Sequence, residues 1–210
     1  MKHHLLCAVL CILLGPTAVA LAQSQADKAA TGETKPPTPT QRALPTKGEI
    51  THGTYKNPSI GLEFTPAEGL HLQDPEIKGT PGTTPLLVTV QALDERGGLL
   101  GLSSARRAMI FYADALTYYP EDQRSATRYL RKIVRTNANN GFEQVGGDRA
   151  EQMGGNAFVR ADFAKGALDQ TVLLAVHDGY AFVFIFASYD LDATKELIAA
   201  TKVKITDIGN

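Results

Sequence analysis

The residue pattern with the clearest chemical potential is a row of four arginines in one predicted helix, residues 121–137. They recur at intervals of four and three, as Arg124, Arg128, Arg131 and Arg135, and no acidic residue lies among positions 123–136. On an ideal helix these side chains fall within about 60° of one another. Guanidinium groups bind carboxylates and phosphates through paired hydrogen bonds. The row therefore predicts a site for an acidic partner, a phosphate-rich glycolipid or a membrane surface, and the alternative is a solvated helix face.

A second candidate pair, Arg160 and Asp162, shares one face of a predicted strand with Phe158. Side chains two residues apart on a strand point to the same side of the sheet. The two opposite charges could form the polar floor of a pocket. The alternative is an ordinary ion pair on the sheet surface.

Other motifs favour structural roles over catalysis. The segment 101–105 (GLSSA) is one residue short of a nucleophile elbow, and a helix cap explains its serines. His52, His71 and His177 are the histidines beyond residue 22, and their spacing matches no compact metal motif. The glycine pairs 146–147 and 154–155 lack the residues of a phosphate-binding loop and indicate turns or bulges. We expect no enzyme, and so no catalytic residue, bound metal or cofactor.

The first 22 residues have the composition of a secretory signal peptide. Lys2 precedes an apolar run from Leu5 to Leu14, and Ala20-Leu21-Ala22 provides a cleavage site. The run has ten residues, whereas a membrane-spanning helix needs roughly 20. The pattern predicts export to the periplasm or medium with cleavage after Ala22, and an uncleaved amino-terminal anchor is the alternative.

Residues 23–48 are predicted to be a disordered linker. They contain four prolines and five threonines, and Leu44 is their only large apolar residue. Such a composition cannot bury enough apolar surface to offset the entropy of ordering. The remaining 162 residues, 49–210, have the usual size of one domain. Cys7 and Cys11 are the only cysteines, so a cleaved chain would have neither a thiol nor a disulfide.

Charge is distributed unevenly along the chain. The whole chain carries −1 and residues 1–48 contribute +3, which leaves −4 on residues 49–210. A general nucleic-acid-binding domain would be strongly basic. The composition therefore argues against nucleic acid as a partner, and any attraction for anions must be local.

The coarse order of elements in residues 49–210 begins with a hairpin over 53–64 and a long loop over 65–85. A strand follows over 86–93. A helix capped by Ser103 or Ser104 is predicted to run to Tyr119, because Ala105, Met109, Tyr112 and Leu116 recur at helical spacing. The arginine-rich helix then ends near Asn139-Asn140-Gly141.

The last third is predicted to be an antiparallel meander. Strands near 142–145, 157–163, 171–176 and 180–187 are separated by turn signals, the strongest being Asp178-Gly179. Residues 180–187 are apolar on both faces, which indicates a central strand. Asp190 or Asp192 caps a final helix, and residues 203–205 form an edge strand. The order predicts an α+β domain, a three-layer α/β/α sandwich around a mainly antiparallel sheet.

At this point the chain resembles a known group of domains. The segments 53–58 (GTYKNP), 61–66 (GLEFTP) and 154–160 (GGNAFVR), which lead into Tyr180–Ala187, are similar to the PsbP/Mog1/DcrB-like domains, and more narrowly to exported acidobacteria-type proteins of unknown function. The resemblance spans residues 53–206 and rests on structural turns and strands. It implies an α/β/α sandwich that acts as an accessory or binding module, and it assigns no functional residue.

These observations lead to one expected function and two alternatives. We expect an exported, non-enzymatic accessory or binding protein of the cell envelope, whose partner is an envelope protein or an anionic ligand. Its candidate binding residues are Arg124, Arg128, Arg131, Arg135, Arg160 and Asp162. The alternatives are an envelope hydrolase with an unfamiliar site and a purely structural envelope protein.

Overall fold

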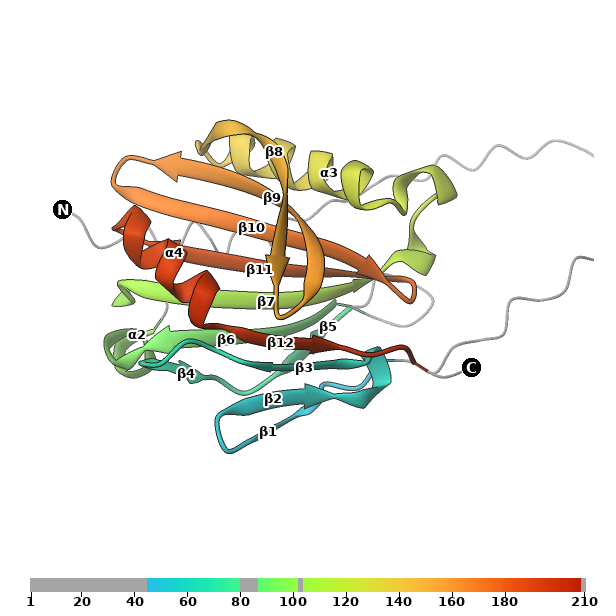
Figure 1. Ribbon diagram of the computed structural model, residues 1–210, viewed down its shortest axis with the longest axis horizontal. Coiled ribbons are helices and arrows are strands. Elements are labelled where there is room, and N and C mark those ends of the chain that lie inside the picture. Colours follow the sequence, from blue (N-terminus) through green and yellow to red (C-terminus); the bar gives the residue numbers. More distant parts are fainter. Residues whose placement is uncertain (1–44, 80–86, 102–103, 209–210) are drawn as a thin grey trace, which may run out of the picture.

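The computed structural model describes residues 45–79, 87–101 and 104–208, and its main element is an antiparallel sheet of eight strands (Figure 1). Seven strands follow the order β4-β6-β7-β11-β10-β9-β8, and β5 also pairs with β6. The strands are β4 (Leu70–Leu72), β5 (Glu76–Lys78), β6 (Leu87–Asp94), β7 (Arg107–Ala115), β8 (Glu143–Met153), β9 (Asn156–Lys165), β10 (Leu168–His177) and β11 (Tyr180–Ser188).

A second, four-stranded antiparallel sheet has the order β1-β2-β3-β12. It joins the start of the domain to its end, because β3 pairs with the last strand. Its strands are β1 (Glu49–Thr51), β2 (Thr54–Asn57), β3 (Leu62–Thr65) and β12 (Lys202–Ile205). The turn between β2 and β3 contains the short helix η1 (Pro58–Ile60), which the Asn57 side chain caps by accepting from the Ser59 amide.

Three α-helices are described, of which two cover the large sheet. Helix α2 (Glu95–Leu100) follows β6, α3 (Ala126–Asn139) precedes β8, and α4 (Leu191–Ala200) links β11 to β12. Two short helices, η3 (Leu116–Tyr118) and η4 (Glu121–Gln123), connect β7 to α3. Figure 1 shows α3 along the upper edge of the molecule and α4 in front of the strands.

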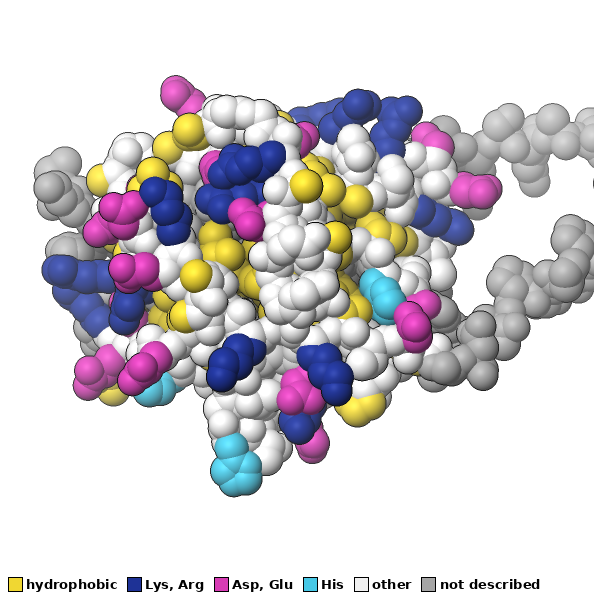
Figure 2. Space-filling model, in the orientation of Figure 1, with side chains coloured by type: hydrophobic (Ala, Val, Ile, Leu, Met, Phe, Trp, Pro, Cys, Tyr) yellow, Lys and Arg dark blue, Asp and Glu magenta, His cyan; other side chains and the backbone are white. Residues whose placement is uncertain are grey.

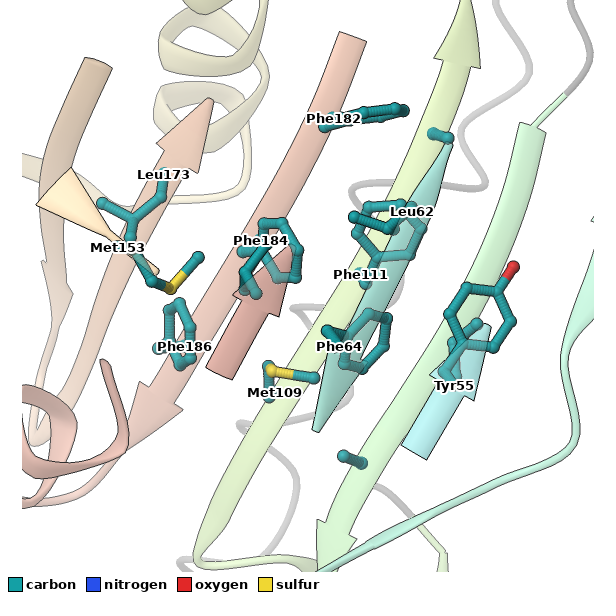
Figure 3. Packing of buried hydrophobic residues seen from close by; sticks show 14 of the residues in the cluster. Tyr55, Leu62, Phe64, Met109, Phe111, Met153, Leu173, Phe182, Phe184 and Phe186 are labelled. Carbon is teal, nitrogen blue, oxygen red and sulfur yellow. The ribbon is translucent and has the colours of Figure 1, made fainter. Parts of the chain in front are cut away.

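The second face of the large sheet carries the small sheet as well as α4. Tyr55 and Phe64 of the small sheet lie in one buried cluster with Phe111 and Phe184 of the large sheet. Figure 3 shows these rings meeting between the layers, and the Phe64 and Phe184 ring centroids are 5.6 Å apart. The α/β/α sandwich is therefore not confirmed: the layers are a helix, the large sheet, and a small sheet beside a helix.

The opposite face of the large sheet packs against α3. Tyr129, Leu130 and Ile133 of the helix lie in a second buried cluster with residues of five strands, including Val183 and Ile185 of β11. The strand β11 separates the two clusters and every one of its nine residues is buried. The prediction of a central strand covered on both faces is confirmed.

The hairpins and most turns agree with the sequence analysis. The Asp178-Gly179 turn joins β10 to β11, Gly154-Gly155 joins β8 to β9, and the pairing of β8 with β9 shifts register between Val145 and Arg149. Asp190 caps α4 by accepting a hydrogen bond from the Asp192 amide. The final strand, β12, is an edge strand as expected.

The predicted helix from Ser103 or Ser104 to Tyr119 is wrong, because most of this segment is the strand β7. Met109, Phe111 and Ala113 face one core, whereas Ala108, Ile110 and Tyr112 face the other. A strand covered on both faces is apolar throughout, so its sequence also satisfies a helical spacing. Strands β4 and β5 were missed within the predicted loop, and α2 was missed altogether.

The predicted signal peptide, residues 1–22, and nearly all of the predicted linker, residues 23–48, lie outside the described residues. Within the described ranges no helix is long and apolar enough to cross a membrane.

Candidate binding surface

The helix α3 has two chemically distinct faces and carries Arg128, Arg131 and Arg135. The predicted helix start near residue 121 is wrong: residues 121–123 form η4, and Arg124 follows them, before the Ser125 cap of α3. Ser125 begins it, since its side chain accepts a hydrogen bond from the Arg128 amide. Tyr129, Leu130, Ile133 and Asn137 are buried against the sheet. The four arginines, Arg124, Arg128, Arg131 and Arg135, are all exposed. The sequence pattern is therefore realised as a basic ridge, by which we mean these four side chains, and Figure 2 shows basic side chains gathered over α3 at the upper edge.

The start of α3 is anchored to the sheet by a buried carboxylate, Asp114 of β7. Its Oδ2 accepts hydrogen bonds from the hydroxyls of Tyr119, at 2.5 Å, and Tyr129, at 2.6 Å. Asp114 is only 4% exposed, and its Oδ1 has no hydrogen-bond partner among the described residues. Burying a carboxylate costs free energy unless it is hydrogen-bonded. The two tyrosine hydroxyls therefore offset the cost of burying Asp114, and Asp114 in turn fixes the positions of both tyrosines.

Lys132 completes this anchor from the exposed side of α3. Its Nζ donates to the Tyr119 hydroxyl at 2.8 Å and lies 4.5 Å from the Tyr119 ring centroid and 5.2 Å from that of Tyr129. The Tyr119 hydroxyl thus accepts from Lys132 and donates to Asp114. Lys132 is consequently part of the anchor.

The anchor perturbs the ionisation of every member. Burial raises the pKa of Asp114, although hydrogen bonds from Tyr119 and Tyr129 and the charge of Lys132 oppose the shift. Burial, with the nearby Asp114 charge, also raises the pKa of Tyr119 and Tyr129. Burial lowers the pKa of Lys132 against the attraction of Asp114. Groups of residues with shifted pKa values occur at active sites and in structural networks alike. Here the hydroxyls of Tyr119 and Tyr129 both donate to Asp114, within the anchor.

The other end of α3 is also fixed. Asn137 is fully buried and its Oδ1 accepts a hydrogen bond from the Gln170 side chain on β10. Beyond the helix, the Lys165 ammonium donates to the Asn140 carbonyl and lies 5.5 Å from the Phe142 ring centroid. Both ends of α3 are therefore tied to strands of the large sheet, which presents the basic ridge on a fixed support.

The four arginines differ in their partners. Arg124 donates from Nε to the Tyr119 carbonyl at 2.9 Å, so its side chain is partly committed. Arg128, Arg131 and Arg135 make no side-chain hydrogen bond or ion pair with any other residue in the described ranges. Three guanidinium groups therefore remain available to a ligand on the exposed side of α3.

Arg160 and Asp162 lie on another face, away from α3, and are joined in one network. Arg160 is 8% exposed and donates to Asp162 Oδ1 and to Glu151 Oε2, both at 2.9 Å. Asp162 also accepts from Thr171 at 2.6 Å and from Arg149. The two predicted residues do meet, as an ion pair on one strand face, and their polar groups are already satisfied within the protein.

An open pocket of about 260 Å³ adjoins this network. Arg160 lines the pocket. The other lining residues come from the β8–β9 hairpin, such as Met153, and from α4 and the residue after it, such as Lys195, Ile198 and Thr201. Because the Arg160 guanidinium already faces two carboxylates, the pocket offers a ligand little free charge. The ridge on α3 is thus the better candidate surface.

One group of side chains in the described ranges could hold a metal ion. It consists of His177, Asp178 and Asp207, whose ligand atoms lie within 4.8 Å of one another. The sequence analysis considered His177 and found no metal motif, because the second carboxylate comes from a segment 30 residues further along the chain. Ser103 of the predicted elbow lies outside the described residues.

The sequence analysis also missed the anchor of α3. Asp114 falls in the segment that was predicted to be helical, so it had no assigned position relative to Tyr129. One signal was available: an acidic residue inside an otherwise apolar run, residues 108–116, needs buried partners. Tyrosine and lysine on the apolar flank of the next helix are suitable donors.

The chain is similar to solved structures but not to known sequence families. No protein-family model matches the chain, and no curated protein matches it. The solution structure of cyanobacterial PsbP (CyanoP) from Synechocystis sp. PCC 6803 is 13% identical, with a TM-score of 0.47. The match covers 75% of this chain and 96% of that one. A likeness at this level carries no conclusion about function, and the wider resemblance to Mog1 and DcrB domains and to exported acidobacterial proteins stays a prediction.

Proposed function

We propose that this protein is a non-enzymatic binding module that docks an acidic surface of a partner protein against the basic ridge of α3. The proposal includes export to the periplasm or medium, with residues 23–48 serving as a tether or spacer. It rests on the exposed arginine side chains of α3.

The observation that carries the proposal is that the guanidinium groups of Arg128, Arg131 and Arg135 have no side-chain partner among the described residues. Like charges at spacings of three and four repel by a few tenths of a kcal/mol per pair. This domain is acidic overall, with −4 on residues 49–210, yet none of its described acids is placed against these three arginines. An external row of carboxylates would relieve the repulsion and satisfy the donors.

The shape and surroundings of the ridge favour a protein over a membrane. Arg135 is seven residues after Arg128, so the part of the ridge that lies on α3 is roughly 10 Å long at 1.5 Å per residue. Exposed acids flank it in the sequence: Glu121 and Asp122 are in η4, before α3, and Glu143 follows just after its end. A flat anionic bilayer would bring these acids against its headgroups, whereas a narrow acidic strip on a protein fits between them.

The test is affinity capture from cell-envelope extract with a variant that removes the free charges. In the ridge variant, Arg128, Arg131 and Arg135 are each changed to Ala. The matched control changes three exposed basic residues on other elements to Ala, namely Arg96, Arg106 and Lys202. Both variants lose three positive charges, so a general electrostatic effect would affect them equally.

We expect wild type and the control to capture the same discrete protein and the ridge variant to lose it. Capture should weaken as salt rises, because contacts between exposed charges are screened over about 10 Å at 0.1 M ionic strength. Equal capture by all three forms would overturn the proposal, and so would capture of phospholipid without protein.

A further inference from the structure

A second chemically distinct site lies where the β10–β11 hairpin meets the carboxyl-terminal segment. His177 and Asp178 are at the tip of the hairpin, and Thr206 and Asp207 follow β12. His177 Nε2 is 3.4 Å from Asp178 Oδ2, 3.5 Å from Asp207 Oδ1 and 3.3 Å from the Thr206 carbonyl oxygen. One imidazole nitrogen therefore faces three oxygen atoms from two distant parts of the chain.

The fold holds these groups in place. Thr206 donates its amide to the Gly61 carbonyl at 2.8 Å, which fixes the segment after β12 to the turn before β3. The Ile208 amide donates to Asp178 Oδ2 at 2.8 Å and its side chain packs against the core. A hydrogen bond that orients a carboxylate in this way is the usual support of a metal ligand.

The distances fit a coordination shell. Zinc binds histidine nitrogen and carboxylate oxygen at about 2.0–2.2 Å. In a tetrahedral site such bonds place neighbouring ligand atoms about 3.4 Å apart, by simple geometry from that length. The three separations from His177 Nε2, 3.3, 3.4 and 3.5 Å, agree with this value. The ligand atoms of His177, Asp178 and Asp207 also lie within 4.8 Å of one another, so these three side chains can converge on one ion.

We propose that His177, Asp178, Asp207 and the Thr206 carbonyl form a binding site for a divalent first-row transition metal such as Zn²⁺. One imidazole with three oxygens suits these ions, whereas Ca²⁺ and Mg²⁺ prefer shells of oxygen alone. The set has no thiolate, so it is not a site for soft metals. Bound metal would tie the hairpin tip to the carboxyl-terminal segment.

The experiment measures Zn²⁺ binding to the untagged full chain by isothermal titration calorimetry, together with H177A, D207N and H71A. Asp207 is 93% exposed at its side chain, so D207N tests the site without disturbing folding. His71 is an exposed histidine on β4 and serves as the matched control. Nuclear magnetic resonance with Co²⁺ then locates the ion by broadening of amide signals.

Wild type and H71A should share a binding event that H177A and D207N weaken by at least about 10-fold, because loss of an outer-shell partner alone typically costs 10- to 100-fold in metal affinity. Broadening should centre on residues 177–178 and 206–208. The proposal is overturned if H177A and D207N bind Zn²⁺ as wild type does, if wild type does not bind it, or if the broadening centres elsewhere.

Discussion

The anchor of α3 makes a quantitative prediction for Tyr129→Phe. The substitution keeps the ring, which is 4% exposed, and so creates no cavity. It removes the 2.6 Å hydrogen bond to Asp114 Oδ2 and leaves the carboxylate with the Tyr119 hydroxyl as its remaining donor in the described ranges. Hydrogen bonds to charged groups contribute about 1.5–3 kcal/mol. A loss near 2 kcal/mol lowers the Tm of a domain of this size by about 4–8 °C.

The pH dependence of this loss has a definite sign. Burial raises the pKa of Asp114 above its ordinary value, so its contribution to folding stability falls as pH rises through the folded pKa. The lost hydrogen bond served the ionised form. The free-energy difference between wild type and Tyr129→Phe should therefore be larger at pH 8 than at pH 4.

Urea unfolding at both pH values measures these differences. Tyr189→Phe is the matched control, because Tyr189 is 37% exposed and makes no hydrogen bond in the described ranges. We expect the control to change the free energy of unfolding by less than about 0.5 kcal/mol. The reasoning is refuted if Tyr129→Phe is as stable as this control at pH 8.

Three further substitutions test other parts of the structure. Gly154→Ala should unfold the domain or strongly destabilise it in urea, because a Cβ there would lie 2.1 Å from the Val203 carbonyl oxygen and φ is +60°; near-wild-type stability would contradict the packing of that turn on β12. Burial alone would raise the pKa of Asp162, but hydrogen bonds from Thr171, Arg160 and Arg149 lower it. Wild type should therefore lose stability as pH falls through that lowered pKa, and Asp162→Asn should remove this loss; parallel pH profiles of unfolding would count against the network. Phe184→Ala should cost about 3–5 kcal/mol by calorimetry, since Phe184 is fully buried between the sheets; a cost below about 1 kcal/mol would refute that contact.

The sequence predicted those elements whose signals are local. Asp178-Gly179 and Gly154-Gly155 specify hairpin turns through backbone conformations that few other residues adopt. The helix α3 was predictable because Leu130 and Ile133 alternate with arginines at a helical period. These signals do not depend on what the rest of the chain does.

The wrong secondary-structure prediction arose at a strand that is buried on both faces, because such a strand lacks the alternating polar residues that identify a strand in the sequence. In β7, Met109 and Tyr112 are three residues apart and face opposite cores, but the spacing alone is equally typical of one helix face. The small sheet was missed as a layer for a related reason. Its strand β12 pairs with β3, more than 130 residues earlier, and no local pattern specifies that partner.

The candidate sites divide in the same way. Three of the four arginines of the basic ridge lie within one helix, so the ridge could be identified from spacing alone. The anchor around Asp114 and the group at His177 each join segments that are distant in sequence. Both depend on which strands lie side by side, and the sequence pattern assigned β7 to a helix.

The most direct test of the docking proposal is site-specific photo-crosslinking in living cells. A photoreactive phenylalanine analogue is placed at Thr127 or Ala138, two exposed positions of α3 beside the basic ridge, and at His52 on the distant β1–β2 hairpin as the control. If the ridge docks a partner, positions 127 and 138 will give one discrete protein adduct that position 52 lacks, with the crosslink in an acidic segment of that protein. Adducts at position 52 alone, or no protein adduct at positions 127 and 138, would contradict a docking surface on α3.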